Sequence, residues 1–269
     1  MEKQMIKLIA TDMDGTWLKA DKTYDMDLFK KDFDLMKQNN VKLVIASGNQ
    51  YENIFARFPQ EYSEQMYFVA ENGALVAQGR QVLKIDNLSQ DLYELLLKIA
   101  AESGYPSIVA ALTSAYVLKK DGKEHFESNQ RFFKKLKQVD SYGEVNDRVF
   151  KVSLIVPPDE MPEFLAYLKQ KYPQVGFVAG GFDSIDMSTP GMNKAVGLKY
   201  LSQKLGINSK DMVSFGDSEN DVAMLKFTGQ SFVTATALPV AKKAAKQIIG
   251  SSEDSSVQKE IIHLLDISK

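Results

Sequence analysis

Short apolar runs alternate with amphipathic stretches along the first third of this 269-residue chain. Runs rich in aliphatic and aromatic residues at 5–11, 41–47 and 66–71 predict buried strands. Apolar positions at helical spacing predict a helix at 25–39 and a shorter one beginning near Gln50. Since these strands lack polar alternation and helices separate them, they are typical of parallel strands covered on both faces of a sheet.

The last third of the chain shows the same alternation. A helix is expected at 192–206, where apolar residues share one helical face and the last residue is glycine. Buried strands are expected at 211–217 and 231–235. Helices are expected from about Glu219 and at 239–247. Both ends of the chain therefore fit a single doubly wound α/β domain with a mostly parallel sheet.

The middle of the chain has closely spaced patterns that suit hairpins and a mixed or antiparallel sheet. We expect helices at 89–103, 123–137 and 160–171 and strands at 107–112, 115–119, 149–156, 175–179 and 183–187. These patterns predict an α+β domain at 83–187, inserted into a Rossmann-like core formed by 1–82 and 188–269. Within that core, the serine-rich segment 250–256 predicts a solvated loop before the last helix.

The chain contains no cysteine, which excludes disulfides, thiolate metal sites and cysteine nucleophiles. Its net charge of −2 gives no sign of a surface for polyanions, so no nucleic-acid partner is expected. The apolar stretch before Asp12 is shorter than the roughly 7–15 residues of a signal-peptide core. No run approaches the ~18 apolar residues of a membrane span. We therefore expect a cytoplasmic protein without a membrane partner.

Two aspartates, Asp12 and Asp14, directly follow the first predicted strand. Positions two apart in extended backbone face the same way, so both carboxylates would converge at the carboxyl end of that strand. Ligands bind at this end of the strands in open α/β sheets. A hard cation such as Mg²⁺ would offset the repulsion between the two carboxylates. Taken alone, the pair is more typical of a turn or a helix cap.

Further polar residues occur at other strand ends and at one helix start: Ser47, Gly48, Lys194, Asp217 and Asp221. Each of them alone is better explained as a cap, a turn residue or a solvated side chain. Because the carboxyl ends of parallel strands meet at one edge of a sheet, their joint occurrence indicates a shared site.

Four segments, in this order, carry a resemblance to a known family: "DMDGT" (12–16), "ASGN" (46–49), "MNKAVGL" (192–198) and "GDSENDVAML" (216–225). They resemble the four signature motifs of the haloacid dehalogenase-like hydrolases. The inserted domain is similar to the α/β cap of the Cof-type phosphatases in that superfamily. The segments "VIASGNQY", "FVAENGALV" and "TSAYV" look closest to its bacterial sugar-phosphate phosphatase branch.

This resemblance implies a Mg²⁺-dependent phosphatase of small phosphorylated metabolites, sugar phosphates in particular. Asp12 would be the nucleophile, and Asp14 would protonate the leaving group and later deprotonate the attacking water. Mg²⁺ would be held by the Asp12 side chain, the Asp14 backbone carbonyl and Asp217, with Asp221 in direct contact or just behind. The transferring phosphoryl group would contact the Ser47 hydroxyl, the Gly48 amide, Lys194 and Asn220.

Several nearby residues have smaller expected parts. Thr16 would satisfy the backbone of its turn, and Trp17 could either line the entrance or pack. Many Cof-type relatives have arginine where this chain has Asn49, so a cation near the substrate is expected to be missing. His263 lies in an apolar helix and predicts a structural role, whereas His125 lies in a stretch typical of a solvated basic face.

Other functions are compatible with parts of the pattern. The substrate could instead be flavin mononucleotide, pyridoxal phosphate or a nucleotide, and a sugar phosphomutase would use the same core. A phosphorylated receiver domain is disfavoured, since its acidic pair precedes the phosphorylated aspartate by most of a β–α unit and it lacks an inserted domain. A catalytically inactive binding protein is disfavoured because every expected acidic group is present. The physiological substrate and the oligomeric state stay open.

Overall fold

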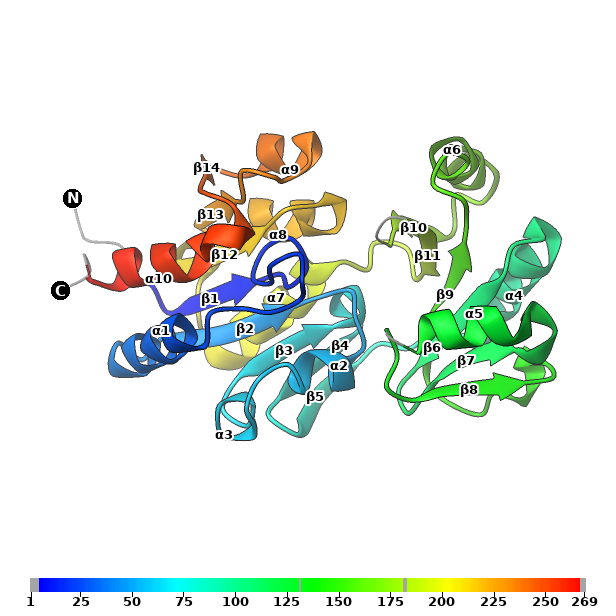
Figure 1. Ribbon diagram of the computed structural model, residues 1–269, viewed down its shortest axis with the longest axis horizontal. Coiled ribbons are helices and arrows are strands. Elements are labelled where there is room, and N and C mark those ends of the chain that lie inside the picture. Colours follow the sequence, from blue (N-terminus) through cyan, green and yellow to red (C-terminus); the bar gives the residue numbers. More distant parts are fainter. Residues whose placement is uncertain (1–4, 131, 181–182, 267–269) are drawn as a thin grey trace. The chain divides into compact units, whose positions relative to one another are not determined.

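The computed structural model describes residues 5–130, 132–180 and 183–266, which belong to two compact units (Figure 1). The first unit consists of Met1–Lys84 and Asn193–Lys269, and the second consists of Ile85–Met192. The outermost residues of the expected core, 1–4 and 267–269, lie outside the described residues.

The first unit is built around a sheet with the strand order β14-β13-β12-β1-β2-β3-β4-β5. Its strands are β1 (Leu8–Thr11), β2 (Lys42–Ala46), β3 (Tyr67–Ala70), β4 (Leu75–Gln78), β5 (Gln81–Ile85), β12 (Met212–Gly216), β13 (Gln230–Val233) and β14 (Gln247–Ile248). Pairings from β14 to β3 are parallel, whereas β4 is antiparallel to β3. The expected doubly wound, mostly parallel sheet is confirmed.

Helices connect and cover these strands: α1 (Met26–Gln38), α2 (Tyr51–Phe55), α3 (Gln60–Ser63), α7 (Lys194–Leu205), α8 (Val222–Phe227), α9 (Pro239–Ala244) and α10 (Ser256–Asp266). Short 3₁₀ turns lie at Glu71–Gly73, Ser209–Asp211, Glu219–Asp221 and Ser252–Asp254. Leu8 and Ala10 of β1 pack in one cluster with Leu198 of α7. Since alternate strand residues share a face, the residue after β1 in phase with them, Asp12, is directed toward the α7 side of the sheet.

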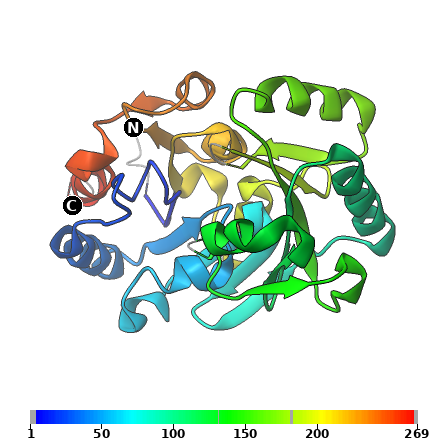
Figure 2. The same ribbon diagram turned by 45° about the vertical axis from the view of Figure 1, so that its right-hand side comes forward.

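The second unit contains a sheet with the order β10-β11-β9-β6-β7-β8, in which only the β7–β8 pairing is parallel. Its strands are β6 (Ser107–Ala111), β7 (Ala115–Leu118), β8 (Leu136–Val139), β9 (Val149–Ile155), β10 (Gly176–Ala179) and β11 (Ser184–Ser188). Its helices are α4 (Gln90–Ser103), α5 (Gly122–Asn129) and α6 (Met161–Lys171), with 3₁₀ turns at Lys119–Asp121 and Tyr142–Glu144 (Figure 2). Leu96 of α4 and Leu168 of α6 pack with Val152 and Leu154 of β9. The mixed, largely antiparallel sheet agrees with the sequence pattern.

Three element predictions need correction. The helix expected at 123–137 ends at Asn129, and Leu136–Val139 instead forms β8, because pairing with β7 draws it into the sheet; residue 131 lies outside the described residues. The helix expected at 239–247 ends at Ala244, since Gln247–Ile248 pairs with β13. The segment 250–256 is not simply a solvated loop, because Ser252 and Ser255 are buried.

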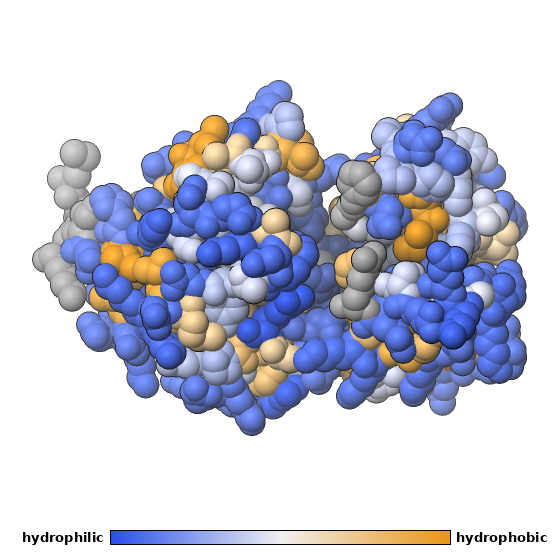
Figure 3. Space-filling model, viewed as in Figure 1, coloured by the Kyte–Doolittle hydropathy of each residue, from blue (hydrophilic) through white to orange (hydrophobic). Residues whose placement is uncertain are grey.

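The outer surface agrees with the polar composition of the chain. The face drawn in Figure 3 is mostly hydrophilic, with apolar residues in separate small areas. Large exposed apolar side chains include Leu238, Val240 and Ile248, at α9 and the edge strand β14. Within the described ranges, no helix combines the length and the apolar character needed to cross a membrane.

Asp32 is a buried carboxyl within α1 and lies outside the predicted site. Its side chain is fully buried, and neither oxygen accepts a hydrogen bond from the described residues. Burial raises the pKa of Asp32 to about 9, although the charge of Lys31 opposes the shift. The folded chain therefore holds a proton near neutral pH that the unfolded chain, with an aspartate pKa near ~4, releases.

Asp32→Asn is expected to stabilise the protein increasingly as the pH rises. Because the pKa of Asp32 is raised in the folded state, the contribution of this group to the stability of the wild type is lost as the pH rises from about 4 to about 9. The variant has no such group, so its advantage grows by at most about 1.4 kcal/mol per pH unit. Urea unfolding at pH 5, 7 and 8.5 measures the difference, with the exposed Asp34→Asn on the same helix as control. Parallel pH curves for wild type and Asp32→Asn would contradict the prediction.

Candidate active site

The candidate site begins where β1 ends. The Asp12 backbone amide donates a hydrogen bond of 3.0 Å to the Phe215 carbonyl, which fixes Asp12 beside the end of β12. Lys194 is the first residue of α7, whose N-cap Asn193 accepts a hydrogen bond from the Ala195 amide. Asp12 is directed toward α7, and Lys194 is the first residue of that helix. These two residues, 182 positions apart in the sequence, are therefore in contact.

Lys194 is fully buried between two carboxylates. Its Nζ lies 2.6 Å from Oδ1 of Asp12 and 2.6 Å from Oδ1 of Asp221. Burial by itself would lower the pKa of Lys194, but the charges of Asp12 and Asp221 outweigh it and raise that pKa. The lysine therefore stays charged, and it holds the Asp12 carboxylate in one orientation.

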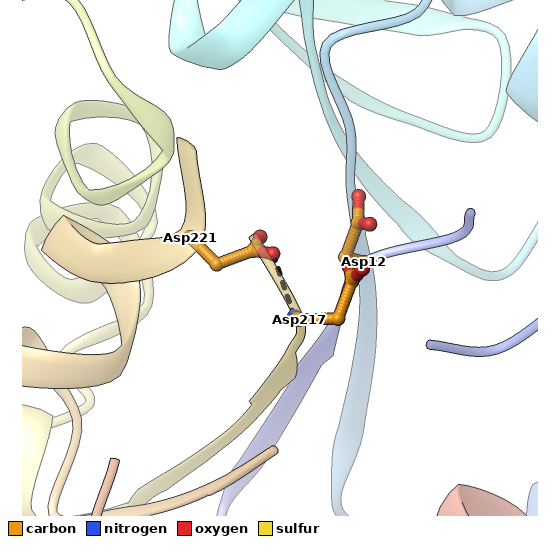
Figure 4. Close-up of side chains that lie close together, drawn as sticks. All are labelled: Asp12, Asp217 and Asp221. Carbon is orange, nitrogen blue, oxygen red and sulfur yellow. Dashed lines mark hydrogen bonds between the residues drawn. The ribbon is translucent and has the colours of Figure 1, made fainter. Parts of the chain in front are cut away.

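Three carboxylates gather at this edge of the sheet. Asp12, Asp217 and Asp221 each offer an oxygen that lies within 4.8 Å of the others (Figure 4). Burial, followed by the charge of Asp221, raises the pKa of Asp217 to about 6. The possible ligand atoms of this group are all carboxylate oxygens, and the single positive charge of Lys194 does not neutralise three negative charges. Both properties fit a hard divalent cation such as Mg²⁺.

Asp221 is already engaged on both oxygens. Its Oδ1 accepts from Lys194, and its Oδ2 accepts from the backbone amides of Asp217 at 2.9 Å and Ser218 at 3.0 Å. A Cβ at Gly216 would lie 2.6 Å from atoms of Asp221, so this close approach requires glycine. Asp221 thus fixes the loop that carries Asp217.

The turn after β1 depends on Gly15. Its φ of +72° is in the left-handed region, and a Cβ there would lie 2.5 Å from Asp217 Oδ2. The Thr16 hydroxyl donates to Asp217 Oδ1 at 3.1 Å, so the expectation that it satisfies the turn backbone is wrong. Both residues shape the space around Asp217.

Asp14 lies outside the three-carboxylate group and has its own partners. Lys22 Nζ lies 2.7 Å from Oδ1 of Asp14, and Asn49 Nδ2 donates to Oδ2 at 2.9 Å. Burial would raise the pKa of Asp14, but the hydrogen bond and charge of Lys22 outweigh it and lower that pKa. The ionised form of Asp14 is therefore favoured.

Three of the four expected phosphate-binding residues lie near Asn72, whose amide donates to the Ser47 carbonyl at 3.1 Å; the fourth, Lys194, lies between Asp12 and Asp221. Ser47 Oγ accepts from the Asn49 amide at 3.1 Å, and a Cβ at Gly48 would lie 3.0 Å from Asn72 Oδ1. Asn220 Nδ2 donates to the same Asn72 oxygen at 3.2 Å. Asn72 was not among the residues predicted for the site, and its φ of +53° is the left-handed conformation that asparagine adopts in turns. Its position after a strand end was the signal that could have placed it in the site.

Three side chains left out of the predicted site have defined surroundings. Trp17 is fully buried and its ring packs near Phe29 and Phe58, so of its two expected roles the structure supports packing. His263 is exposed on α10, so it does not belong to the core. His125 is half-buried on α5 beside Asn129, so the solvated face expected for its segment is only partly observed.

Comparisons with known proteins identify the family of the chain. A profile of the haloacid dehalogenase-like hydrolases matches residues 9–261. A 5-amino-6-(5-phospho-D-ribitylamino)uracil phosphatase of Escherichia coli (strain K12) is 34% identical over 255 residues, which are 94% of this chain and 93% of the relative. A crystal structure from Streptococcus mutans UA159 has a TM-score of 0.91 and 29% identity, covering 97% of this chain and 99% of that one.

A haloacid dehalogenase subclass IIB sugar phosphatase shares the fold, with a TM-score of 0.81 and 18% identity over 96% of this chain and 98% of that one. The chain belongs to the haloacid dehalogenase-like hydrolases, and the resemblance carried by its motifs is confirmed. It is an enzyme of that family, a phosphoric monoester hydrolase.

Proposed function

We propose that the protein is a cytoplasmic, Mg²⁺-dependent phosphatase that hydrolyses phosphomonoesters of small metabolites, sugar phosphates in particular. The observation that carries the proposal is the Asp12 carboxylate, held at the end of β1 by the buried Lys194 beside Asp217 and Asp221. This arrangement supplies an oriented nucleophile together with positive charge for a phosphoryl group.

Asp12 attacks phosphorus and forms an acyl phosphate as the bond to the ester oxygen breaks. Asp14 donates a proton to the departing alkoxide, then removes a proton from the water that releases inorganic phosphate. Lys22 and Asn49 support the ionised form of Asp14 that this second step requires. The first step requires the protonated form of Asp14, which Lys22 disfavours by lowering its pKa, and the proton taken from water restores that form at the end of the cycle.

Asp12, Asp217 and the Asp14 backbone carbonyl would hold Mg²⁺. When bound, the ion supplies charge against the phosphoryl oxygens. Since both oxygens of Asp221 already accept hydrogen bonds, we assign it to holding Lys194 and the Asp217 loop rather than to the metal directly. The Ser47 hydroxyl, the Gly48 amide, Lys194 and Asn220 would bind the phosphoryl group.

The rest of the substrate is assigned to the second unit, Ile85–Met192, as a specificity cap. The E. coli relative is named for a phosphorylated ribityl compound, which supports a substrate with a sugar-derived chain. Flavin mononucleotide, pyridoxal phosphate and nucleotides are the competing substrates. A sugar phosphomutase would return the phosphoryl group to its product rather than release it.

Phosphate release from sugar phosphates, polyol phosphates, nucleotides, flavin mononucleotide and pyridoxal phosphate tests the proposal. We expect release from at least one sugar-derived phosphate with Mg²⁺ present. Chelation by EDTA should lower the rate at least about 100-fold, because a metal contributes several kcal/mol of charge stabilisation. Dependence on an added sugar bisphosphate would indicate the mutase, and no release from any compound would contradict a phosphatase.

A further inference from the structure

Lys22 occupies an unusual backbone position close to the candidate site. Its φ is +66°, a left-handed conformation that non-glycine residues rarely adopt. The turn is closed by two backbone bonds of 2.9 Å, from the Lys22 amide to the Lys19 carbonyl and from the Lys19 amide to the Thr23 carbonyl. Residues held in such conformations cluster at functional sites, which makes Lys22 a candidate for a role in the site.

The ammonium group of Lys22 completes a set of donors around Asp14. Lys22 contacts Oδ1 at 2.7 Å, and Asn49 donates to Oδ2 at 2.9 Å, so each carboxylate oxygen has one donor from a different loop. The Lys22 loop follows β1, whereas Asn49 follows β2. Two donors on different oxygens fix the plane of a carboxylate, which a single contact does not.

The contact is too exposed to be explained by stability. The Lys22 side chain is 52% exposed and the Asp14 side chain is 43% exposed. An ion pair with this exposure contributes little to folding. The left-handed φ of Lys22 belongs to the tight turn between Lys19 and Thr23, and this turn presents the ammonium group to Asp14, which points to a requirement of the chemistry instead.

We propose that Lys22 and Asn49 together position the Asp14 carboxylate for proton transfer, an inference that rests on the proposed function. Neither residue touches phosphorus in this role; both act through Asp14. The cation expected to be missing because Asn49 replaces arginine is supplied by Lys22, from the other loop. Arg57 supports this loop, since its Nη1 donates to the Lys22 carbonyl at 3.4 Å.

The dependence on the leaving group tests this role. An alkoxide needs a proton as it departs, whereas 4-nitrophenolate leaves without one. For Lys22→Met we expect kcat/KM to fall about 10- to 100-fold on a sugar phosphate, because a misplaced acid transfers protons slowly. On 4-nitrophenyl phosphate the fall should stay below about 2-fold. Equal falls on both substrates would overturn the proposal.

Three variants separate positioning from charge and from strain. Lys22→Arg should restore most of the activity on the sugar phosphate. Lys22→Gly relieves the backbone strain, so it should unfold at the same or a higher temperature while losing activity like Lys22→Met. Lys30→Met removes an exposed lysine of α1 and should leave kcat/KM unchanged on both substrates. Full activity of Lys22→Gly on the sugar phosphate would also contradict the role.

A double-mutant cycle keeps this inference distinct from the proposed function. In an Asp14→Asn background, Lys22→Met should cause no further selective loss on the sugar phosphate, because the positioned group is already gone. If wild type releases no phosphate, the proposed function fails. If Asp14→Asn lowers kcat/KM much more on the sugar phosphate than on 4-nitrophenyl phosphate but Lys22→Met lowers both equally, only the positioning role fails.

Discussion

Asp12→Asn is expected to lower phosphate release at least about 10⁴-fold, because it removes the nucleophile while leaving the other groups in place. Asparagine has nearly the same shape as aspartate, and its Oδ1 can still accept from Lys194. The substitution also removes one negative charge from the group of three carboxylates that includes Asp217 and Asp221. The fold should therefore be retained, and the variant should unfold at a temperature close to that of wild type.

Acid quenching during turnover of a labelled substrate provides a second measurement. Wild type should retain label as an acyl phosphate, whereas Asp12→Asn should retain none. Asp27→Asn, an exposed change at the start of α1, is the matched control and should behave like wild type. Phosphate release by Asp12→Asn at the wild-type rate would exclude Asp12 as the nucleophile.

Lys194→Met is expected to destabilise the protein by about 3 kcal/mol or more in the absence of divalent metal. The substitution keeps an unbranched apolar side chain one atom shorter than lysine, but leaves Asp12 and Asp221 without the ammonium group that lies 2.6 Å from each. Removing one partner from a buried ion pair leaves uncompensated charge in a low-dielectric environment. Activity should be lost as well, since the nucleophile loses its orienting contact.

The pH dependence of this loss has a definite sign. Without Lys194, burial and the neighbouring carboxylates keep the folded-state pKa of Asp12 and Asp217 above their unfolded value near ~4. The folded chain then holds protons that the unfolded chain releases, so stability falls as the pH rises. Urea unfolding should therefore show a smaller loss at pH 5 than at pH 8.

Added Mg²⁺ gives an independent readout for the same variant. Because Asp12 and Asp217 are the carboxylates proposed to hold the ion, Mg²⁺ should stabilise Lys194→Met and raise its unfolding midpoint with concentration. The exposed control Lys199→Met removes a lysine from the same helix and should show neither the loss nor this response. A Lys194→Met protein as stable as wild type at pH 8 without metal would contradict the prediction.

The central strands of the first unit could be predicted from the sequence because β1, β2, β3, β12 and β13 are nearly continuous buried runs, and the long helix α1 has a regular apolar face. The helices expected at 123–137 and 239–247 were too long because the ends of those segments pair with strands elsewhere in the chain. Leu136–Val139 became a strand because β7 was available beside it, and Gln247–Ile248 because β13 was. Local propensity does not contain that information.

The sequence by itself determined the alternating architecture and the position of the acidic residues at strand ends, since periodicity and strand-end position are local properties. Only the tertiary structure decided which groups those residues meet. It placed Lys194 between Asp12 and Asp221, and it divided the first two aspartates between different partners. Asp14 faces Lys22 and Asn49 because two loops from neighbouring strands converge on it, and the distances between loops are set by the packed sheet rather than by sequence separation.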